Sequence, residues 1–288
     1  MNGTLYVVAT PIGNREDITA RAIKILNEVD YIAAEDTRTT QNLLRMYNIS
    51  NQTVSNHKFN EQRNKDLLLS YLREGKNIAV VSDAGTPCIS DPGFVLIRAA
   101  IDNDIPIIGI CGANAAITAL SISGFYCSSF SFYGFLPRKA SEIREAFSKA
   151  ANNNVKVCVY YESPKRIKKT ISILELATPT ANVCLCNDLT KLYERTYRGK
   201  PEKILELLES NPDSEKGEYT IVVEFPETLP ESLTVCCEET NEGKIVNYMI
   251  NNHVSAKEAI SALTGKGASK KELYTAALHL KELFSYDN

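Results

Sequence analysis

Short apolar runs alternate along the first half of the chain with segments whose apolar residues recur every three or four positions. The runs have the length of buried strands, and they lie at 5–9, 31–34, 77–81 and 105–110. The segment Arg63–Arg73, with Leu67, Leu68 and Leu72 on one side, has the spacing of an amphipathic helix. Strands that alternate with helices predict an α/β fold with a parallel sheet.

The same alternation returns in the second half of the chain. The pattern predicts strands at 155–161, 182–186 and 219–225, and helices at 164–176 and 201–209. The segment 126–131, between the two halves, is expected to act as a hinge. Because 288 residues exceed one minimal domain, we expect two α/β domains, residues 1–121 and residues 122–228.

The last part of the chain has a different pattern. An acidic segment with prolines, 226–243, predicts a linker. Ser255 and Ser269 each precede a glutamate by three residues, Glu258 and Glu272, and this spacing predicts capping boxes at the starts of two helices. We therefore expect residues 229–288 to form an acidic linker and a small helical appendage that resembles a helix–turn–helix.

The loop from Val80 to Gly93 is the most distinctive segment of the chain. An apolar strand ends there in the sequence SDAGTPCISDPG, after which an apolar helix begins. Small residues let a ligand approach the backbone closely, and strand ends in open α/β sheets are where ligands bind. The loop matches neither the Walker nor the dinucleotide fingerprint. It predicts a ligand loop of another kind, with a plain strand–helix turn as the alternative.

Several longer motifs follow one another along nearly the whole chain. They begin with LYVVATPIGN at Leu5, AAEDTR at Ala33 and SDAGTP at Ser82, and continue with FYGFLPRK at Phe132, YYESPKRI at Tyr160, LTKLYERTYRG at Leu189 and GEYTIVVE at Gly217. In this order they resemble the tetrapyrrole methylase superfamily. The resemblance is strongest to its branch of small-subunit ribosomal RNA cytidine-2′-O-methyltransferases.

The resemblance implies a two-domain tetrapyrrole-methylase-like fold, with S-adenosylmethionine bound in a cleft between the domains. It also implies a homodimer, and a substrate that is the 2′-hydroxyl of a cytidine in the decoding region of 16S rRNA within the 30S subunit. Matched motif by motif, it implies cofactor contacts by Ile12, Ser82, Asp83, Thr86, Asn114, Ala115, Tyr161, Leu189 and Tyr219. One departure is the sequence CGAN at Cys111–Asn114, where the family usually has a Pro-Gly-x-Ser/Cys turn. Local contacts are expected to differ there.

Methyl transfer to a ribose hydroxyl is an in-line displacement. Alignment carries much of the rate and a nearby proton acceptor helps, whereas the neutral thioether leaving group needs no acid. The candidate acceptors, of which at most one would act as the base, are Glu35, Asp36, Glu162, His57 and Glu61. Side chains alternate along a strand, so we expect Glu35 and Asp36 to point to opposite sides. Asp91 is interpreted as part of a helix start.

The charge of the chain is unevenly distributed. The net charge is −3, yet residues 138–203 hold 14 Lys and Arg against seven Asp and Glu. A basic block on an acidic protein is suited to RNA phosphates, with a solvated helical face as the alternative. The predicted RNA contacts are Arg38, Lys165, Arg166, Lys168 and Lys169. The helical appendage either contacts RNA or only packs.

Composition excludes several other classes of protein. The eight cysteines form no C-x-x-C pair and several lie in apolar runs, which favours reduced, buried thiols. Three histidines argue against a zinc site. No apolar run approaches the roughly 20 residues that span a bilayer, and the first residues lack the basic region of a signal peptide. We expect a cytoplasmic protein without a metal or a membrane partner.

Two other functions stay open. One is a methylase of a small tetrapyrrole-like molecule, which the basic block, the helical tail and the TPIGN and AEDTR motifs disfavour. The other is a non-catalytic accessory protein that binds S-adenosylmethionine or RNA, which the intact acids Glu35, Asp36 and Asp83 disfavour.

Overall fold

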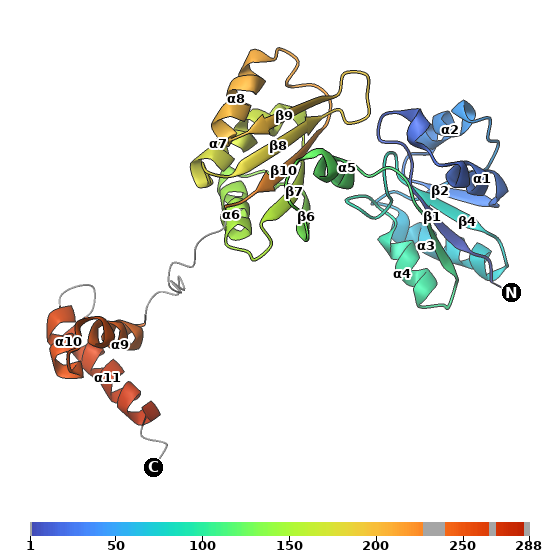
Figure 1. Ribbon diagram of the computed structural model, residues 1–288. Coiled ribbons are helices and arrows are strands. Elements are labelled where there is room, and N and C mark those ends of the chain that lie inside the picture. The colour runs from blue at the N-terminus through green and yellow to red at the C-terminus, as the bar shows by residue number, and fades with distance from the viewer. Residues whose placement is uncertain (1, 227–239, 265–268, 285–288) are drawn as a thin grey trace. The chain divides into compact units, whose positions relative to one another are not determined.

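The computed structural model describes residues 2–226, 240–264 and 269–284, and the chain forms two compact units, 1–228 and 229–288 (Figure 1). The first unit holds two five-stranded sheets, and the second holds helices. Most of the predicted acidic linker falls on residues 227–239, which lie outside the described residues.

The first sheet is entirely parallel, as predicted, with the strand order β3-β2-β4-β1-β5. Its strands are β1 (Leu5–Val8), β2 (Tyr31–Ala34), β3 (Thr53–Ser55), β4 (Ile78–Val81) and β5 (Ile107–Ile110). Its helices are α1 (Ala20–Glu28), α2 (Thr37–Met46), α3 (Glu61–Arg73) and α4 (Phe94–Ile101), with the short 3-10 helix η1 (Arg15–Asp17) before α1.

Side chains that alternate along these strands build a core on each face of the sheet. Val8, Ile32 and Val81 pack with α1 and α2 on one face. Leu5 and Ile78 pack with α3 and α4 on the other. Because both faces are covered, the strands are apolar throughout, which is why the sequence predicted them.

The second sheet corrects the expectation of a uniform βα alternation. Its strands are β6 (Phe130–Phe135), β7 (Val157–Glu162), β8 (Asn182–Asn187), β9 (Arg195–Gly199) and β10 (Tyr219–Glu224), in the order β6-β7-β10-β8-β9. Only the pair β6–β7 is parallel, and the other neighbours are antiparallel. The cause is topological, since β10 returns between β7 and β8 and a short loop joins β8 to β9. The predicted hinge at 126–131 runs into β6.

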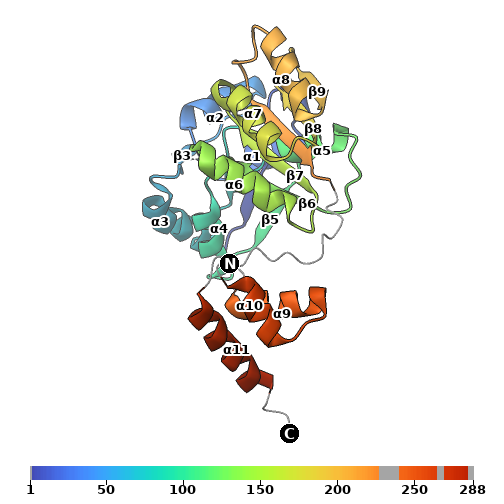
Figure 2. The same cartoon turned by 90° about the vertical axis from the view of Figure 1, so that its left-hand side faces the viewer.

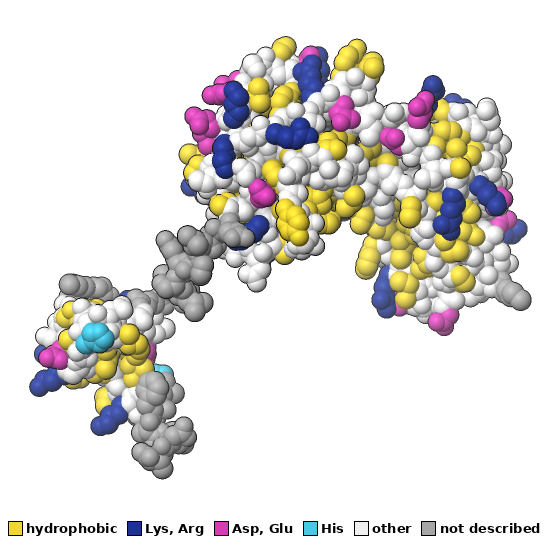
Figure 3. Space-filling view, viewed as in Figure 1, with side chains coloured by type: hydrophobic (Ala, Val, Ile, Leu, Met, Phe, Trp, Pro, Cys, Tyr) yellow, Lys and Arg dark blue, Asp and Glu magenta, His cyan; other side chains and the backbone are white. Residues whose placement is uncertain are grey.

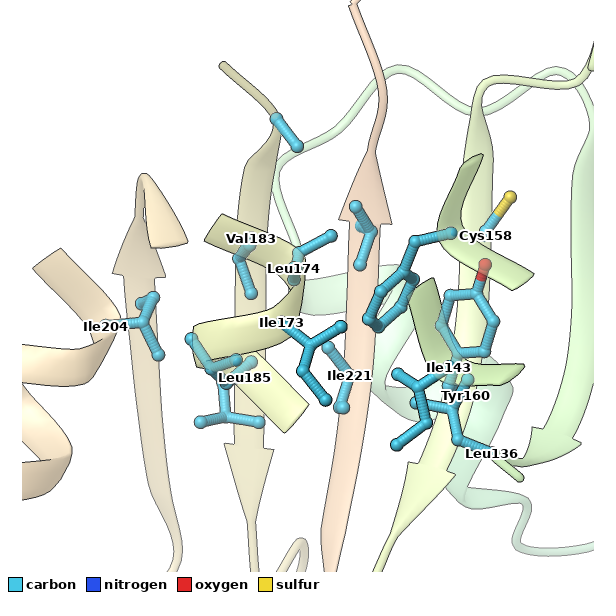
Figure 4. Packing of buried hydrophobic residues seen from close by; sticks show 14 of the residues in the cluster. Leu136, Ile143, Cys158, Tyr160, Ile173, Leu174, Val183, Leu185, Ile204 and Ile221 are labelled. Carbon is cyan, nitrogen blue, oxygen red and sulfur yellow. The ribbon is translucent and has the colours of Figure 1, made fainter. Parts of the chain in front are cut away.

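Helices α6 (Ala140–Ala151), α7 (Ile167–Ala177) and α8 (Pro201–Ser210) contribute to the main core of this sheet, and the 3-10 helix η2 (Pro164–Arg166) precedes α7. Figure 4 shows Tyr160, Leu185 and Ile221 from three neighbouring strands within this core. The alternate residues of the same strands, among them Val159 and Cys184, form a separate core on the other face.

Helix α5 (Ala115–Ile122) packs on that other face of the second sheet. The predicted boundary after residue 121 assigned it to the first domain. Its buried residues are Ala116 and Ala119, which share a core with Val159, Cys186 and Val222. Small side chains let a helix approach a sheet closely, and Ala116 and Ala119 allow α5 to pack tightly on the second sheet.

The described residues of the second unit form three helices rather than the two predicted: α9 (Asn241–Asn252), α10 (Ala256–Leu263) and α11 (Lys270–Phe284). Both predicted capping boxes are present, since each serine and glutamate exchange hydrogen bonds. Helix α9 was missed because its acidic start was interpreted as linker, and it contributes Ile245 to the core of this unit. Among the described helices of the whole chain, none has the length and apolar character needed to cross a membrane.

Candidate active site

A cavity of about 410 Å³ lies in the first unit, between loops of the first sheet and residues of the second. It falls in the range of small-molecule sites, about 300–1,000 Å³. From the first half of the chain it is lined by Ile12, Glu35, Asp83–Thr86, Ile89–Asp91, Asn114 and Ala115. From the second half it is lined by Phe135, 161–164, Leu189 and 218–220. All the predicted cofactor residues except Ser82 therefore meet at one cavity.

Ser82 lies behind the cavity wall and shapes the loop that forms it. It is buried, and its hydroxyl donates to the carbonyl of Ala84. Thr10 and Gly85 exchange backbone hydrogen bonds of 2.9 and 3.0 Å, which fix the loop to the end of β1. Gly85 has φ +82°, a conformation that favours glycine. The loop is thus held from both sides in a shape that exposes its backbone to the cavity.

The departure from the family motif at CGAN has a structural explanation. The side-chain oxygen of Asn114 accepts the N–H of Ile117 and so caps α5, while its Nδ2 donates to Thr86 Oγ1. Asparagine caps a helix as well as serine does. The turn before α5 requires Gly112, because a Cβ there would lie 2.8 Å from that of Ala9. Asn114 therefore joins the start of α5 to the Thr86 loop.

Three carboxylates from loops of the first sheet line the cavity: Glu35, Asp83 and Asp91. Burial raises the pKa of Glu35, while the backbone N–H of Asp83 lowers it and the negative charge of the Asp83 carboxylate raises it. Burial also raises the pKa of Asp83. The pKa of Asp91 rises to about 6, first through burial and then through the charges of Glu35 and Asp83. We name Glu35, Asp83 and Asp91 the acidic wall. It favours a cation in the cavity, because a positive charge relieves the repulsion among its members.

Asp91 was not predicted to line the cavity. It was interpreted as a helix start, but α4 begins at Phe94 with Gly93 as its N-cap, and Asp91 lines the cavity. Proline and glycine after an aspartate are typical of helix starts. The local sequence therefore gave no indication that Asp91 belongs to the acidic wall. Glu218, Phe135 and Ile89 also line the cavity. Glu218 and Phe135 lie within motifs that the resemblance had identified.

Asp36, the second acid of AAEDTR, is absent from the cavity lining. Its carboxylate caps α2 by accepting the N–H of Arg38, and it pairs with the Arg38 guanidinium at 2.8 Å. These bonds to Arg38 lower the pKa of Asp36 to about 2. Its own N–H donates to Asp83. The two acids thus separate as strand alternation predicts, and the geometry favours a structural role for Asp36.

Glu162 lines the cavity but its carboxylate is fully engaged within the protein. It accepts from the hydroxyl of Thr170 at 2.8 Å and from the N–H of Ser163 at 2.7 Å, and it pairs with Arg166 at 3.0 Å. The guanidinium also donates to the carbonyls of Leu136 and Pro137. This network favours a positioning role for Glu162 and a structural role for Arg166.

Replacing Glu162 by Ala is expected to destabilise the protein by about 3–5 kcal/mol, because the guanidinium of Arg166 would stay partly buried without its partner. Urea unfolding followed by circular dichroism measures the change. Glu209→Ala, on the exposed face of α8, is the matched control and is expected to change stability by less than about 0.5 kcal/mol. Equal stability of the two variants would contradict the role of this ion pair.

Aromatic rings, among them those of Phe135 and Tyr161, form one part of the cavity wall on the side of the second sheet. Tyr161 packs edge-to-face on Phe132 and Phe135, with ring centroids 5.0 and 5.6 Å apart. Burial raises the pKa of Tyr161, whereas the backbone of Ala116 at the start of α5 lowers it. A flat aromatic ligand group would find a complementary surface here.

The remaining predicted residues do not line the cavity. Lys165, Lys168 and Lys169 follow Pro164, a lining residue, and of these Lys168 is half-buried while the other two are exposed. His57 and Glu61 do not line the cavity. Glu61 accepts the N–H of Gly93 at 3.1 Å, which ties the start of α3 to the Asp91 loop. Within the described ranges, no group of three or more His, Cys, Asp or Glu side chains is arranged to hold a metal ion.

Residues 4–205 match the family model of tetrapyrrole (corrin/porphyrin) methylases. The chain belongs to this family. Ribosomal RNA small subunit methyltransferase I of Halalkalibacterium halodurans is 42% identical, over 94% of this chain and 93% of that protein. The protein of the same name from Bacillus subtilis is 38% identical, over 97% and 95% of the two chains. The predicted family is therefore confirmed, as is the enzyme class, a methyltransferase that uses S-adenosylmethionine.

Solved structures support the fold. The native form of uroporphyrin III C-methyl transferase from Thermus thermophilus matches 76% of this chain and 97% of its own, with a TM-score of 0.54 and 15% identity. The methyltransferase CobJ matches 77% and 94%, with a TM-score of 0.57 and 15% identity. The predicted tetrapyrrole-methylase-like fold is confirmed.

Proposed function

We propose that this protein transfers a methyl group from S-adenosylmethionine to the ribose 2′-hydroxyl of a cytidine in the decoding region of 16S rRNA, with the 30S subunit as substrate. The observation that carries the proposal is a cofactor-sized cavity whose wall continues directly, through Ser163 and Pro164, into the exposed lysines of the basic block. The names of the close relatives support an rRNA substrate. Such a substrate would place the protein in the cytoplasm.

The residues of the cavity fit the proposed cofactor. The acidic wall suits its positive charges, and the ring of Tyr161 suits an adenine. The exposed backbone at the start of α5, beside Asn114 and Ala115, is suited to a carboxylate because free N–H groups point outward at a helix start. When bound, S-adenosylmethionine supplies an activated methyl group on a sulfonium sulfur.

Within this arrangement we assign the proton acceptor to Glu35. It lies at the carboxyl end of β2, it lines the cavity, and burial raises its pKa toward the range useful for a base. Asp83 donates its N–H weakly to Glu35, at 3.4 Å, and accepts from Asp36, so it holds the end of β2 in place. Asp91 is assigned to the electrostatic attraction of the cofactor.

The basic block is expected to contact phosphates. Reversing the charge of Lys165, Lys168 and Lys169 together should weaken rRNA binding. The slope of the logarithm of the association constant against the logarithm of the salt concentration should become less steep by about two to three. The affinity for S-adenosylmethionine should stay within about twofold. Arg166 is left unchanged because its guanidinium is bound within the fold.

Binding is measured by filter retention between low and physiological salt. The matched control reverses Lys24, Arg73 and Lys76, three exposed cations outside both the basic block and the cavity wall. The same salt slope in both triple variants would show that the basic block is only a solvated face.

A methylase of a small tetrapyrrole-like molecule is the rival with the same fold. Labelled S-adenosylmethionine, offered together with uroporphyrinogen and with 30S subunits from a strain that lacks the gene, separates the two. We expect label in RNA. Label in the small-molecule fraction alone would overturn the proposed substrate while leaving the cofactor site intact.

We also propose a homodimer, as the family resemblance implies. Hydrophobic side chains gather on the surface over α4 (Figure 3), where Phe94 is 68% and Ile101 52% exposed. The edge strand β6 exposes Phe135 as well. Apolar patches of this kind are typical of association surfaces.

A further inference from the structure

The most exposed large hydrophobic side chain among the described residues is Phe59, which is 93% exposed. It lies in the turn between β3 and α3, on the outer edge of the first sheet (Figure 2). Its ring contacts that of His57 edge-on, with 6.1 Å between the centroids. A phenylalanine in this position adds almost nothing to a core, so its exposure needs another explanation.

The turn that carries Phe59 is firmly built. The N–H of His57 donates to Asn60 Oδ1 at 2.7 Å, and the N–H of Phe59 donates to the ring nitrogen of His57 at 3.2 Å. Asn60 also donates to the hydroxyl of Ser55 at 3.0 Å. These bonds hold the turn from both ends. The ring is therefore presented on a fixed support.

The same turn is joined to the cavity through backbone contacts. The N–H of Asn56 donates to the carbonyl of Ala34, the residue before Glu35. The carboxylate of Glu61 accepts the N–H of Gly93, two residues after Asp91. Phe59 thus lies on a segment fixed to two elements of the acidic wall.

The charge around Phe59 favours an anionic partner. Lys58 precedes it, Arg63 follows it in the first turn of α3, and both side chains are exposed. Arg38 is also exposed. It lies in the first turn of α2, three residues after Glu35. The acid in the turn, Glu61, is engaged by Gly93. An exposed ring between exposed cations is the arrangement with which proteins bind single-stranded RNA, since bases stack on the ring and phosphates meet the cations.

We propose that Phe59 is a stacking platform for a base of the RNA substrate, at or next to the methylated nucleotide, and that Lys58 and Arg63 bind the flanking phosphates. This inference rests on the proposed function and adds a base-binding subsite to it. Stacking on Phe59 would keep the nucleotide unstacked from its neighbours in the RNA, with its ribose toward Glu35.

Methylation kinetics on 30S subunits test the platform. Phe59→Ala is expected to lower kcat/KM for the subunit about 10- to 100-fold, as loss of base–aromatic stacking does. Phe59→Leu, which keeps apolar area without a ring, should also be impaired, whereas Phe59→Trp should retain transfer. The affinity for S-adenosylmethionine should be unchanged in all three. Met46→Ala, at an exposed site at the end of α2 and outside the basic block, is the control and should behave as the unaltered protein.

The absence of tryptophan from the chain permits a direct readout. In Phe59→Trp, binding of purified 16S rRNA should quench the indole fluorescence, while in Met46→Trp the same bound RNA should leave it unchanged. Equal emission in the two variants with RNA bound, or full transfer by Phe59→Ala and Phe59→Leu, would overturn the platform alone. Failure of the unaltered protein to methylate RNA would instead overturn the proposed function, and the platform with it.

Discussion

Replacing Glu35 by Gln is expected to lower the rate of methyl transfer by about 100- to 10,000-fold, the usual contribution of a general base. Glu35 lines the cavity and burial raises its pKa, so its carboxylate is placed to accept the proton of the ribose hydroxyl. The amide keeps the shape of the side chain and removes its basicity. The affinity for S-adenosylmethionine should change little, because the acidic wall keeps Asp83 and Asp91.

Asp36→Asn is the matched control, because it makes the same chemical change one residue along the strand. Asp36 caps α2 and pairs with Arg38, outside the cavity. Its amide variant should keep a transfer rate within about tenfold of normal, because asparagine can also cap α2. Single-turnover methylation with saturating cofactor and 30S subunits measures both variants. Near-normal rates for Glu35→Gln would remove it as the base and leave alignment to carry the chemistry.

The affinity for S-adenosylmethionine is expected to fall about tenfold between pH 7 and pH 5. Asp91 has a pKa of about 6, raised by burial and by the charges of Glu35 and Asp83. A cation in the cavity favours the ionised carboxylate, so affinity rises as the pH rises through 6 and is lost as Asp91 takes up a proton below it. In Asp91→Asn the affinity should be lower at pH 7 and nearly flat across this range.

Calorimetry at a series of pH values measures this dependence. S-adenosylhomocysteine provides a matched ligand, since it lacks the sulfonium charge and keeps the amino group. A steep profile for the methyl donor beside a shallow one for S-adenosylhomocysteine would place Asp91 near the sulfonium. An unaltered pH profile in Asp91→Asn would remove Asp91 from the cofactor site.

Sequence motifs predicted which residues lie together, but not which contacts their side chains make. The motifs brought Asp83, Thr86, Tyr161 and Leu189 to one cavity, because strand ends and the loops after them converge in this fold. Patterns could not show that the carboxylate of Glu162 is bound by Thr170 and Arg166, since that network depends on how β7 meets α7.

Strands that are buried on both faces of a sheet were predictable, because they are apolar throughout. The strands of the first sheet were found for that reason, apart from β3, which has three half-buried residues. Helix α2 was missed because its sequence, TRTTQNLLRM, buries only Thr40 and Leu44. Local sequence patterns could not predict the order of strands in the second sheet. The position of β10 is set by its pairing with β7 and β8, which are distant in the sequence.

The central claim is that the methyl group is placed on a cytidine ribose of the small-subunit RNA. The direct measurement uses 30S subunits from a strain that lacks the gene, methylated by the purified protein with labelled S-adenosylmethionine. The RNA is then digested to nucleosides, which are separated and identified by mass. A methylated ribose cannot assist cleavage of its phosphodiester, so the modified position also resists alkali. We expect label in 2′-O-methylcytidine from a single, alkali-resistant position. Label in a base-methylated nucleoside, or in no nucleoside, would contradict it.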